Sequence, residues 1–378
     1  MKILNVNALL DPVTGGGTAE RTVQMSRALR DAGAECSILT TDVGLTNGRA
    51  PQLDGIRVTA YRCLIRRFYI PRARYAEIRR KVESSDIVHL MGHWTVLNAL
   101  VYLGARATRK PYVVCPAGAL RIYGRSKMLK KAYNWVVGRR VIWNASAWIA
   151  ITEDERAQFE AYGIDPSKVS VIPNGINPAD FPGEGAAEFR ERHGLGYRPI
   201  VLFFGRLNFI KGPDILLEAF CRSLHGWPDW HLVFAGPDGG LLSALKDRAA
   251  ECAAREHVHF IGYVGGREKS SAYYAADLLV IPSRQEAMSI VVLEAGICGT
   301  PVLLTDQCGF DEVDRIGGGK VVSATVEGVQ AGLADMLSDR ARLVAMGNEL
   351  RNYVHDNYTW DVVVRKYLDL YNALLAKP

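Results

Sequence analysis

Acidic residues are missing from a long part of the chain, with none between Asp86 and Glu153. Residues 1–180 contain 26 Lys and Arg but only 15 Asp and Glu, whereas residues 181–378 contain 20 and 25. An excess of one sign in one half of a chain indicates a partner of the opposite sign. We therefore expect an anionic partner for the N-terminal half.

Cysteine is scarce and has no paired spacing: there are seven in 378 residues. Cys36, Cys115 and Cys298 lie in or beside apolar runs, so we expect buried free thiols in a reducing compartment. This interpretation excludes disulfides and a thiolate metal site. No His and Asp cluster has ligand spacing either, so we expect no metal and no cofactor beyond the substrates.

Long apolar runs are also missing. The most membrane-like run, residues 90–105, is interrupted by His93, Asn98 and Gly104 and is too short to span a bilayer comfortably. It predicts a strand, a loop and a buried helix. The first residues enter a strand pattern directly, so we expect no signal peptide and a cytoplasmic location.

Short apolar runs alternate with longer amphipathic stretches along the chain. Such runs, with few internal charges, are typical of parallel strands buried on both faces. The alternation predicts a doubly wound α/β fold, with helices such as 19–32, 214–223 and 243–255 as crossovers. The expected strands cover residues 3–6, 37–39, 56–60, 87–90, 112–114, 148–151, 169–172, 200–204, 231–234, 258–261, 278–281 and 302–304.

Proline and glycine gather once, in residues 173–198, as they do in linkers. Since the chain exceeds what one core usually serves, we expect two Rossmann-like domains. Their predicted bounds are residues 1–180 and 199–358, with residues 181–198 as the linker. Ligands of such sheets bind beyond the carboxyl ends of the strands, so two facing sheets would leave a deep cleft.

Three glycines, Gly15, Gly16 and Gly17, follow the first strand and precede a helix that Gly33 ends. They allow the backbone to approach a ligand, and the helix start offers unpaired N–H groups to an anion. A flexible loop is an equally good interpretation, because the Gly-x-Gly-x-x-Gly spacing of dinucleotide sites is absent.

Gly205, Arg206 and Leu207 follow the first strand of the second half, and Lys211 with Gly212 comes shortly after. The two cations would lie at a strand's carboxyl end, where they can neutralise a diphosphate without a metal. The alternative is a solvated loop with two surface charges.

Glu286 and Glu294 form the strongest single signal. Glu286 follows a predicted strand, and Glu294 lies within the apolar helix that begins near Ser289 and Ile290. A carboxylate among hydrophobic residues is costly unless something hydrogen-bonds to it. A ribose diol would suit Glu294 and a sugar hydroxyl Glu286, whereas the alternative is a structural carboxylate that ties the helix down.

Together these segments resemble those of the retaining glycosyltransferases of family 4, also called glycosyl transferases group 1, which have the GT-B fold. The resemblance rests on residues 171–176, 203–212 and 286–302, and its order and spacing match along nearly the whole chain. Residues 359–378 resemble the family's last helix, which crosses back onto the N-terminal domain.

The resemblance implies roles for the matching residues. Arg206 and Lys211 would bind the donor diphosphate and act with Glu286, which holds the transferred sugar. Glu294 would bind the ribose hydroxyls, without any metal. The implied donor-binding set is Gly16, Gly17, Gly205, Arg206, Lys211, Glu286, Ser289, Ile290 and Glu294.

The chain departs from the family pattern at Ala117. Many members carry a histidine there, before a glycine, and alanine can neither donate a hydrogen bond nor transfer a proton. His89 and His93 lie in and after the strand at 87–90 and are candidates for contact with acceptor or phosphate. An ordinary hydrogen-bonded histidine is an equally good interpretation of each.

Two basic segments, residues 57–81 and 121–140, interleave cations with apolar and aromatic side chains. This pattern fits a helix on an anionic membrane surface, with a solvated basic face as the alternative. We expect peripheral attachment to the inner face of the plasma membrane and no nucleic-acid partner. The surface candidates are Arg66, Arg67, Arg125, Lys127, Lys130 and Lys131.

The expected activity is transfer of a sugar, with retained configuration, from a nucleoside diphosphate donor to a hydroxyl acceptor. A lipid-linked saccharide in surface polysaccharide assembly is the expected acceptor. One alternative is a sugar-nucleotide epimerase of related fold. Another is a non-catalytic member that only binds a partner, against which the retained Arg206, Lys211, Glu286 and Glu294 argue.

Overall fold

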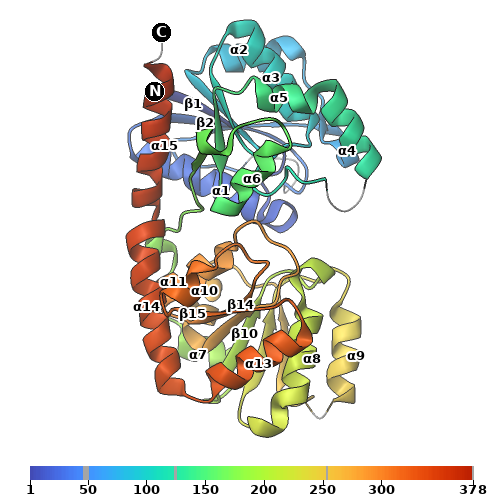
Figure 1. Cartoon of the computed structure of the whole chain (residues 1–378), viewed down its shortest axis with the longest axis vertical. Coiled ribbons are helices and arrows are strands. Elements are labelled where there is room, and N and C mark those ends of the chain that lie inside the picture. The colour runs from blue at the N-terminus through green and yellow to red at the C-terminus, as the bar shows by residue number, and fades with distance from the viewer. Residues whose placement is uncertain (46–50, 123–125, 253, 377–378) are drawn as a thin grey trace. The chain divides into compact units, whose positions relative to one another are not determined.

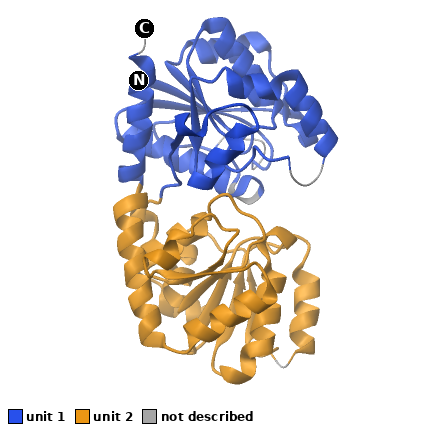
Figure 2. Cartoon of the chain, viewed as in Figure 1, with its two compact units in different colours: residues 1–175, 360–378 blue, residues 176–359 orange. Residues whose placement is uncertain are grey.

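The computed structural model describes residues 1–45, 51–122, 126–252 and 254–376, with the backbone alone of Pro12 and Val13. The chain forms two compact units, residues 1–175 with 360–378 and residues 176–359 (Figure 2). Each unit is a parallel β-sheet with helices packed against it (Figure 1).

The first unit has strand order β3-β2-β1-β6-β7-β8-β9. Its strands are β1 (Lys2–Val6), β2 (Glu35–Thr41), β3 (Arg57–Tyr61), β6 (Ile87–Met91), β7 (Tyr112–Cys115), β8 (Ala147–Ala150) and β9 (Val169–Val171). Its helices are α1 (Pro12–Asp31), α2 (Tyr75–Glu83), α3 (Val96–Thr108), α4 (Lys127–Tyr133), α5 (Arg139–Trp143), α6 (Glu153–Glu160) and α15 (Trp360–Leu375). A separate hairpin pairs β4 (Cys63–Ile65) with β5 (Ile70–Pro71).

The second unit has strand order β12-β11-β10-β13-β14-β15. Its strands are β10 (Ile200–Phe204), β11 (His231–Ala235), β12 (Val258–Gly262), β13 (Leu278–Ile281), β14 (Val302–Thr305) and β15 (Gly319–Val322). Its helices are α7 (Ala186–Arg192), α8 (Pro213–Ser223), α9 (Leu242–Glu251), α10 (Arg267–Ala275), α11 (Ile290–Cys298), α12 (Glu312–Arg315), α13 (Val326–Leu337) and α14 (Arg340–Tyr358).

Strand order reverses once in each sheet, between β1 and β6 in the first unit and between β10 and β13 in the second. At such a reversal the loops after the two neighbouring strands diverge to opposite faces, which opens a crevice at their carboxyl ends. The loops after β10 and β13 contain Lys211 and Glu286, so the topology alone brings these two side chains to one place.

The doubly wound fold and every expected strand are confirmed, whereas β15 and the hairpin strands β4 and β5 were not predicted. The first residues of β15 resemble a glycine-rich turn, but Gly319 is paired with Val302 of β14. A Cβ at this position would lie 2.2 Å from the Val302 carbonyl oxygen, so only glycine allows the strands to approach.

The membrane-like run 90–105 forms the end of β6, a loop and the largely buried helix α3, as predicted. Within the described parts of the chain, no helix is both long and apolar enough to cross a bilayer.

The first segment of the first unit ends at Gly175, slightly before the predicted residue 180, and residues 181–198 belong to the second unit rather than forming a separate linker. These residues pack on α10 of the second unit, where Ser270 donates to the Pro182 carbonyl (2.7 Å) and Ser271 to that of Glu184 (3.2 Å). The proline and glycine residues here belong to a segment that packs closely on α10. The last helix, α15, belongs to the first unit, as expected.

Helix α15 is joined to α1 by a buried arginine. Arg21 is 1% exposed and donates to Asn174 Oδ1 (2.6 Å), to the Ile172 carbonyl (3.0 Å) and to the Tyr367 hydroxyl. The guanidinium therefore connects α1, the end of the first unit's first segment and the returning C-terminal helix.

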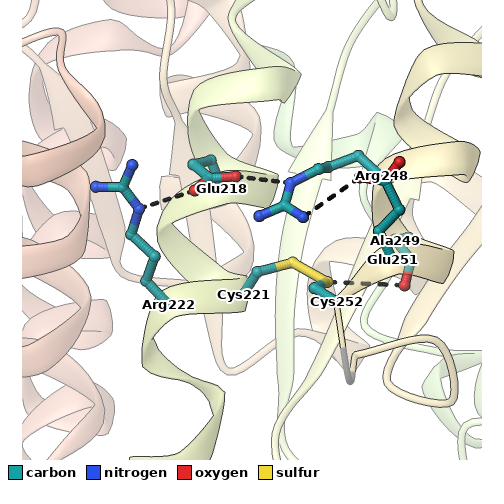
Figure 3. The surroundings of a disulfide bond; sticks show 7 residues. All are labelled: Glu218, Cys221, Arg222, Arg248, Ala249, Glu251 and Cys252. Carbon is teal, nitrogen blue, oxygen red and sulfur yellow. Dashed lines mark hydrogen bonds and ion pairs between the residues drawn. A yellow bond between two sulfur atoms is a disulfide. The ribbon is translucent and has the colours of Figure 1, made fainter.

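The cysteines differ from expectation in one respect. Cys36, Cys115 and Cys298 are buried free thiols, as predicted. Cys221 and Cys252, however, form a disulfide with a Cα–Cα distance of 6.1 Å (Figure 3). The sequence conceals this pair because 31 positions separate the two cysteines, and only the packing of α8 on α9 brings them together.

Candidate functional site

The loop after β10 is held against the loop after β13. Gly212 has a φ of +67°, and a Cβ there would lie 2.0 Å from the Pro282 carbonyl oxygen. A side chain at this position would force the loops apart. Just before the glycine, the Lys211 N–H donates to Asn208 Oδ1 (3.0 Å), which fixes the turn that presents the lysine.

Lys211 and Glu286 form an ion pair, with 2.7 Å between Nζ and Oε1. The Glu286 side chain is 9% exposed, and Oε1 also accepts from the Ser283 hydroxyl at 2.5 Å. The Glu286 N–H donates to the Gln307 carbonyl (2.8 Å), which secures its backbone. Both orienting contacts use Oε1, so Oε2 has the capacity to accept from a sugar hydroxyl.

Arg284, which is not among the predicted site residues, clamps the two loops. Its guanidinium contacts Asp214 with two hydrogen bonds (2.8 and 2.6 Å) and donates to the Phe209 carbonyl (2.7 Å). It also lies 4.0 Å from the centroid of the Phe209 ring. Its own N–H donates to the Ile210 carbonyl at 2.8 Å. Arg284 therefore fixes the turn that ends at Lys211.

The N-terminus of α11 opens at the same crevice. Ser289 is the residue before the helix, and its buried hydroxyl has no hydrogen-bond partner in the described structure. A buried hydroxyl without a partner is costly. Together with the helix N-terminus that starts at Ile290, it suits an anionic or hydroxyl ligand.

Glu294 is 4% exposed, and α10 satisfies both of its oxygens. Lys269 Nζ lies 2.8 Å from Oε1, and the Tyr273 hydroxyl donates to Oε2 at 2.6 Å. The structural role considered for Glu294 is therefore present, and contact with a ribose stays a prediction. Burial and the neighbouring Glu294 carboxylate raise the pKa of Tyr273, so its hydroxyl remains a donor.

Arg206 is half-buried in the loop after β10, close to the loop that follows β11. Leu207 forms a bridge with Asp238, and a Cβ on Gly239 would come within 2.8 Å of Arg206 Cγ. The second candidate cation is thus positioned by the loop that leads into α9.

In the first unit, the helix after β1 starts earlier than predicted. It begins at Pro12 rather than after the glycines, and Asp11 caps it by accepting from the Thr14 N–H (2.7 Å). Gly16, with φ 57° and ψ −145°, breaks the helix, so its main part starts at Gly17. The break keeps a helix start at the carboxyl end of β1, and anion binding there stays a prediction.

Both candidate histidines are core residues. His89 is fully buried, and its Nδ1 lies 2.6 Å from the Tyr371 hydroxyl. His93 is 2% exposed, and its Nε2 lies 3.0 Å from Asn134 Oδ1. Burial lowers their pKa values to about 3 and about 4, so both are neutral near pH 7. This burial favours the ordinary hydrogen-bonded histidine for both residues, and contact with acceptor or phosphate stays a prediction.

Ala117 lies in a strained loop after β7. Its φ of 50° is in the left-handed region, which is uncommon for a residue with a Cβ. The buried Glu155 accepts from the Gly118 N–H (2.5 Å) and from the Ile151 N–H (2.8 Å), and so holds the loop. A half-buried methyl group therefore occupies the place of the family's histidine.

The two basic segments differ in structure. Residues 121–140 include α4 and a π-helical turn at Asn134–Gly138, as the helical spacing predicts, although Arg125 lies outside the described residues. Residues 57–81 do not form one helix but β3, the β4–β5 hairpin and α2. Arg67 donates to Ser126 Oγ (3.1 Å), which joins the hairpin to the start of α4.

Apolar side chains are exposed on both of these elements. On the α4 side, Trp135 is 84% and Met128 77% exposed, and on the hairpin Leu64 is 58% exposed. Exposed cations lie among them, namely Arg66, Arg67, Lys127 and Lys131, with the half-buried Lys130. We call these residues the basic-aromatic surface.

Two family models match the chain. The model described as glycosyl transferase 4-like domain matches residues 16–175, and the model described as glycosyl transferases group 1 matches residues 186–353. A mannosyltransferase of Mycobacterium tuberculosis, named GDP-mannose-dependent alpha-(1-6)-phosphatidylinositol monomannoside mannosyltransferase, is 30% identical over 271 residues. That alignment covers 66% of this chain and 70% of the relative. The chain belongs to the group 1 glycosyltransferases.

Two further similarities agree with this family. A D-inositol 3-phosphate glycosyltransferase of Nocardia farcinica is 34% identical over 249 residues, which cover 63% of this chain and only 54% of the relative. Anabaena HepE, solved with UDP and glucose, has a TM-score of 0.79 at 17% identity and covers 99% of this chain and 100% of its own. The second similarity shows the fold, which is GT-B.

Proposed function

We propose that this protein transfers one sugar, with retained configuration, from a nucleoside diphosphate sugar to a hydroxyl acceptor. The observation that carries the proposal is the Lys211–Glu286 pair, 2.7 Å apart at the reversal of strand order in the second unit. A cation for the leaving diphosphate and a carboxylate for the sugar hydroxyls thus meet at one point. HepE, of the same fold, was solved with UDP and glucose.

In this proposal Arg206 and Lys211 neutralise charge on the leaving diphosphate. Charge that develops in the transition state is where fixed cations contribute most to rate. Glu286 holds the transferred sugar, and Glu294 the ribose. By family analogy the leaving diphosphate itself deprotonates the acceptor hydroxyl. The protein then mainly positions the substrates and neutralises the leaving group.

The first experiment measures thermal stabilisation by UDP, GDP, ADP and dTDP, because a ligand that binds only the folded state raises its melting temperature. The matching donor sugars are then assayed for transfer with and without EDTA. The structure has no group of three His, Cys, Asp or Glu side chains suited to a metal among its described residues. We expect transfer to persist in EDTA, since the two cations neutralise the diphosphate. Loss of transfer on chelation would contradict metal independence.

Two other activities are separated by incubating the donor without acceptor. An epimerase of related fold would convert the donor sugar, whereas a transferase would at most hydrolyse it slowly. A non-catalytic member would bind no nucleoside diphosphate in calorimetry. Retention of Lys211, Glu286 and the buried Ser289 hydroxyl favours the transferase.

We expect the donor sugar to lack a 6-hydroxyl, as in a 6-deoxyhexose or a pentose. The family resemblance implies that the missing histidine would lie near that hydroxyl, whereas Ala117 offers only a methyl group. A buried site rejects polar groups that it cannot satisfy. The Ala117→His variant should shift the ratio of kcat/KM values toward hexoses, because the imidazole restores a hydrogen-bonding group at this position. The substitution should be accommodated, since histidine tolerates the left-handed backbone better than most residues. Equal or better wild-type transfer from glucose, galactose or mannose donors would contradict this expectation.

The proposed acceptor is a lipid-linked saccharide at the cytoplasmic face of the plasma membrane, as in surface polysaccharide assembly. Support comes from the basic-aromatic surface, where exposed apolar side chains lie among cations. Apolar burial and attraction to anionic headgroups act together in such surfaces. The Mycobacterium tuberculosis relative is named for a phosphatidylinositol acceptor, which agrees with a lipid substrate.

Flotation with liposomes tests this attachment. We expect the protein to float with anionic vesicles at low salt, to float less at high salt, and not to float with neutral vesicles. The attraction to anionic headgroups is electrostatic, so salt weakens it, and each cation contributes about 1 kcal/mol at most. Trp135→Ser and Met128→Ser should weaken flotation, whereas Leu103→Ser, at an exposed leucine of α3, should not. Failure of the wild type to float with anionic vesicles at low salt would count against attachment. Full activity on a short water-soluble acceptor would count against a lipid one.

A further inference from the structure

The Cys221–Cys252 disulfide joins two helices that start beside the candidate donor site. Cys221 lies in the last turns of α8, whose first residue, Pro213, comes two positions after Lys211. Cys252 directly follows α9 (Figure 3). The bridge therefore ties together the ends of α8 and α9 that are farthest from the site loops.

The loop before α9 is part of the site's framework. The Leu207 N–H donates to the Pro237 carbonyl (3.0 Å), and the Leu207 carbonyl accepts from Gly239 (3.0 Å) and Leu241 (3.2 Å). Arg206 lies directly before Leu207 and packs close to Gly239. Any movement of residues 236–241 thus reaches the backbone that presents Arg206.

The two tied helices differ in how firmly the core holds them. Buried residues line α8 from Pro213 to Ser223, including Leu216 and Phe220, whereas α9 buries only Leu245 and Ala249. Apart from its apolar contacts, α9 is linked to α8 by Arg248 and Glu218, 2.9 Å apart (Figure 3). Such half-exposed ion pairs hold weakly, because solvent screens them. The disulfide therefore adds a covalent link between α9 and α8 to these weaker contacts.

Both cysteines are half-buried, so a small thiol or disulfide can reach them. A dithiol opens the bridge by thiol–disulfide exchange. One of its thiolates attacks one sulfur, the S–S bond breaks, and a second exchange releases the cyclic disulfide of the reagent. Two electrons and two protons pass to Cys221 and Cys252, which become thiols. A low-molecular-weight disulfide reverses the reaction.

We propose that Cys221 and Cys252 are a reversible redox site that sets the mobility of α9 and of residues 236–241. Through Arg206, this site also sets the affinity for a nucleoside diphosphate. The affinity part rests on the proposed function, whereas the mobility part does not. The cross-linked form keeps the Arg206 backbone preorganised, and reduction removes that preorganisation. The co-reactants are dithiols and low-molecular-weight disulfides.

The test compares the full chain after treatment with glutathione disulfide and after reduction with dithiothreitol, each followed by removal of the reagent. Differential alkylation with mass spectrometry reports the bridge, and hydrogen exchange reports residues 236–241. Calorimetry with UDP, GDP, ADP and dTDP reports binding. We expect reduction to lower the melting temperature by roughly 5–10 °C. We also expect faster exchange in 236–241 and about threefold weaker binding of the preferred nucleotide.

Variants separate this site from general effects of reduction. Cys221→Ser with Cys252→Ser should behave like the reduced form under both treatments. Cys63→Ser, at a half-buried free thiol of the first unit, should behave like the wild type. Alkylation of both cysteines after oxidation would overturn the proposal, as would equal exchange rates in the two states. If both states bind nucleotide equally, only the affinity part fails. If neither redox state binds any nucleotide, the affinity part and the proposed function both fail. The hydrogen-exchange data still test the mobility part.

Discussion

Replacing Lys211 with Ala should lower turnover by about 10²–10³-fold, the cost of removing one fixed group that stabilises transition-state charge. Among the described residues, the ion pair of Lys211 Nζ is with one oxygen of Glu286, so its other ammonium hydrogens can face a ligand. Arg206→Ala should have an effect of the same order. The turnover of both variants is measured by steady-state kinetics with the donor that the nucleotide screen identifies.

The fold should survive the Lys211 substitution. Ser283 still donates to Glu286, and the Arg284 clamp on the loop does not involve the lysine side chain. Circular dichroism and the melting temperature should therefore stay close to those of the wild type. Lys246→Ala is the matched control, because Lys246 is an exposed lysine on α9 of the same unit and should leave turnover unchanged. Near-wild-type transfer by both Lys211→Ala and Arg206→Ala would defeat the assignment of the diphosphate site.

The local sequence pattern was enough to place the two loops that contain Lys211 and Glu286. The strands before Lys211 and Glu286 are uninterrupted apolar runs, and β10 and β13 have the predicted bounds. The side chains that hold the site were not predictable in this way. Arg284 meets Asp214 across 70 positions, and Lys269 meets Glu294 across 25. Such pairs arise from packing between elements, and no local periodicity signals them.

Burial favours the core interpretation of both candidate histidines. A histidine in a strand such as β6 satisfies the sequence pattern whether it faces a ligand or the core. The partner of His89, Tyr371, comes from α15, 282 positions away. Similarly, Asn134 reaches His93 from a π-helical turn, an irregularity that apolar spacing does not reveal. Basic composition did not reveal the β4–β5 hairpin in residues 57–81, because charge content does not distinguish a hairpin from a surface helix.

Replacing Arg21 with Met should produce a large loss of stability in the first unit. The change removes the donor for Asn174 Oδ1 (2.6 Å) and the Ile172 carbonyl (3.0 Å), and also the contact with the Tyr367 hydroxyl. Breaking a buried charged network in this way costs about 3 kcal/mol or more. For a unit of this size the melting temperature should fall by roughly 6–12 °C.

The loss should be local to the attachment of α15. Hydrogen exchange should rise in α15 and around Asn174, because the guanidinium is what links these segments to α1. Arg21→Lys keeps the charge but cannot reach three acceptors with one planar group, so an intermediate loss is expected. Arg27→Met, at a half-exposed arginine of the same helix, controls for helix propensity and net charge. If Arg21→Met melted at the wild-type temperature, with α15 still protected, packing of Tyr367 and Tyr371 alone would hold the helix, and the network would contribute nothing.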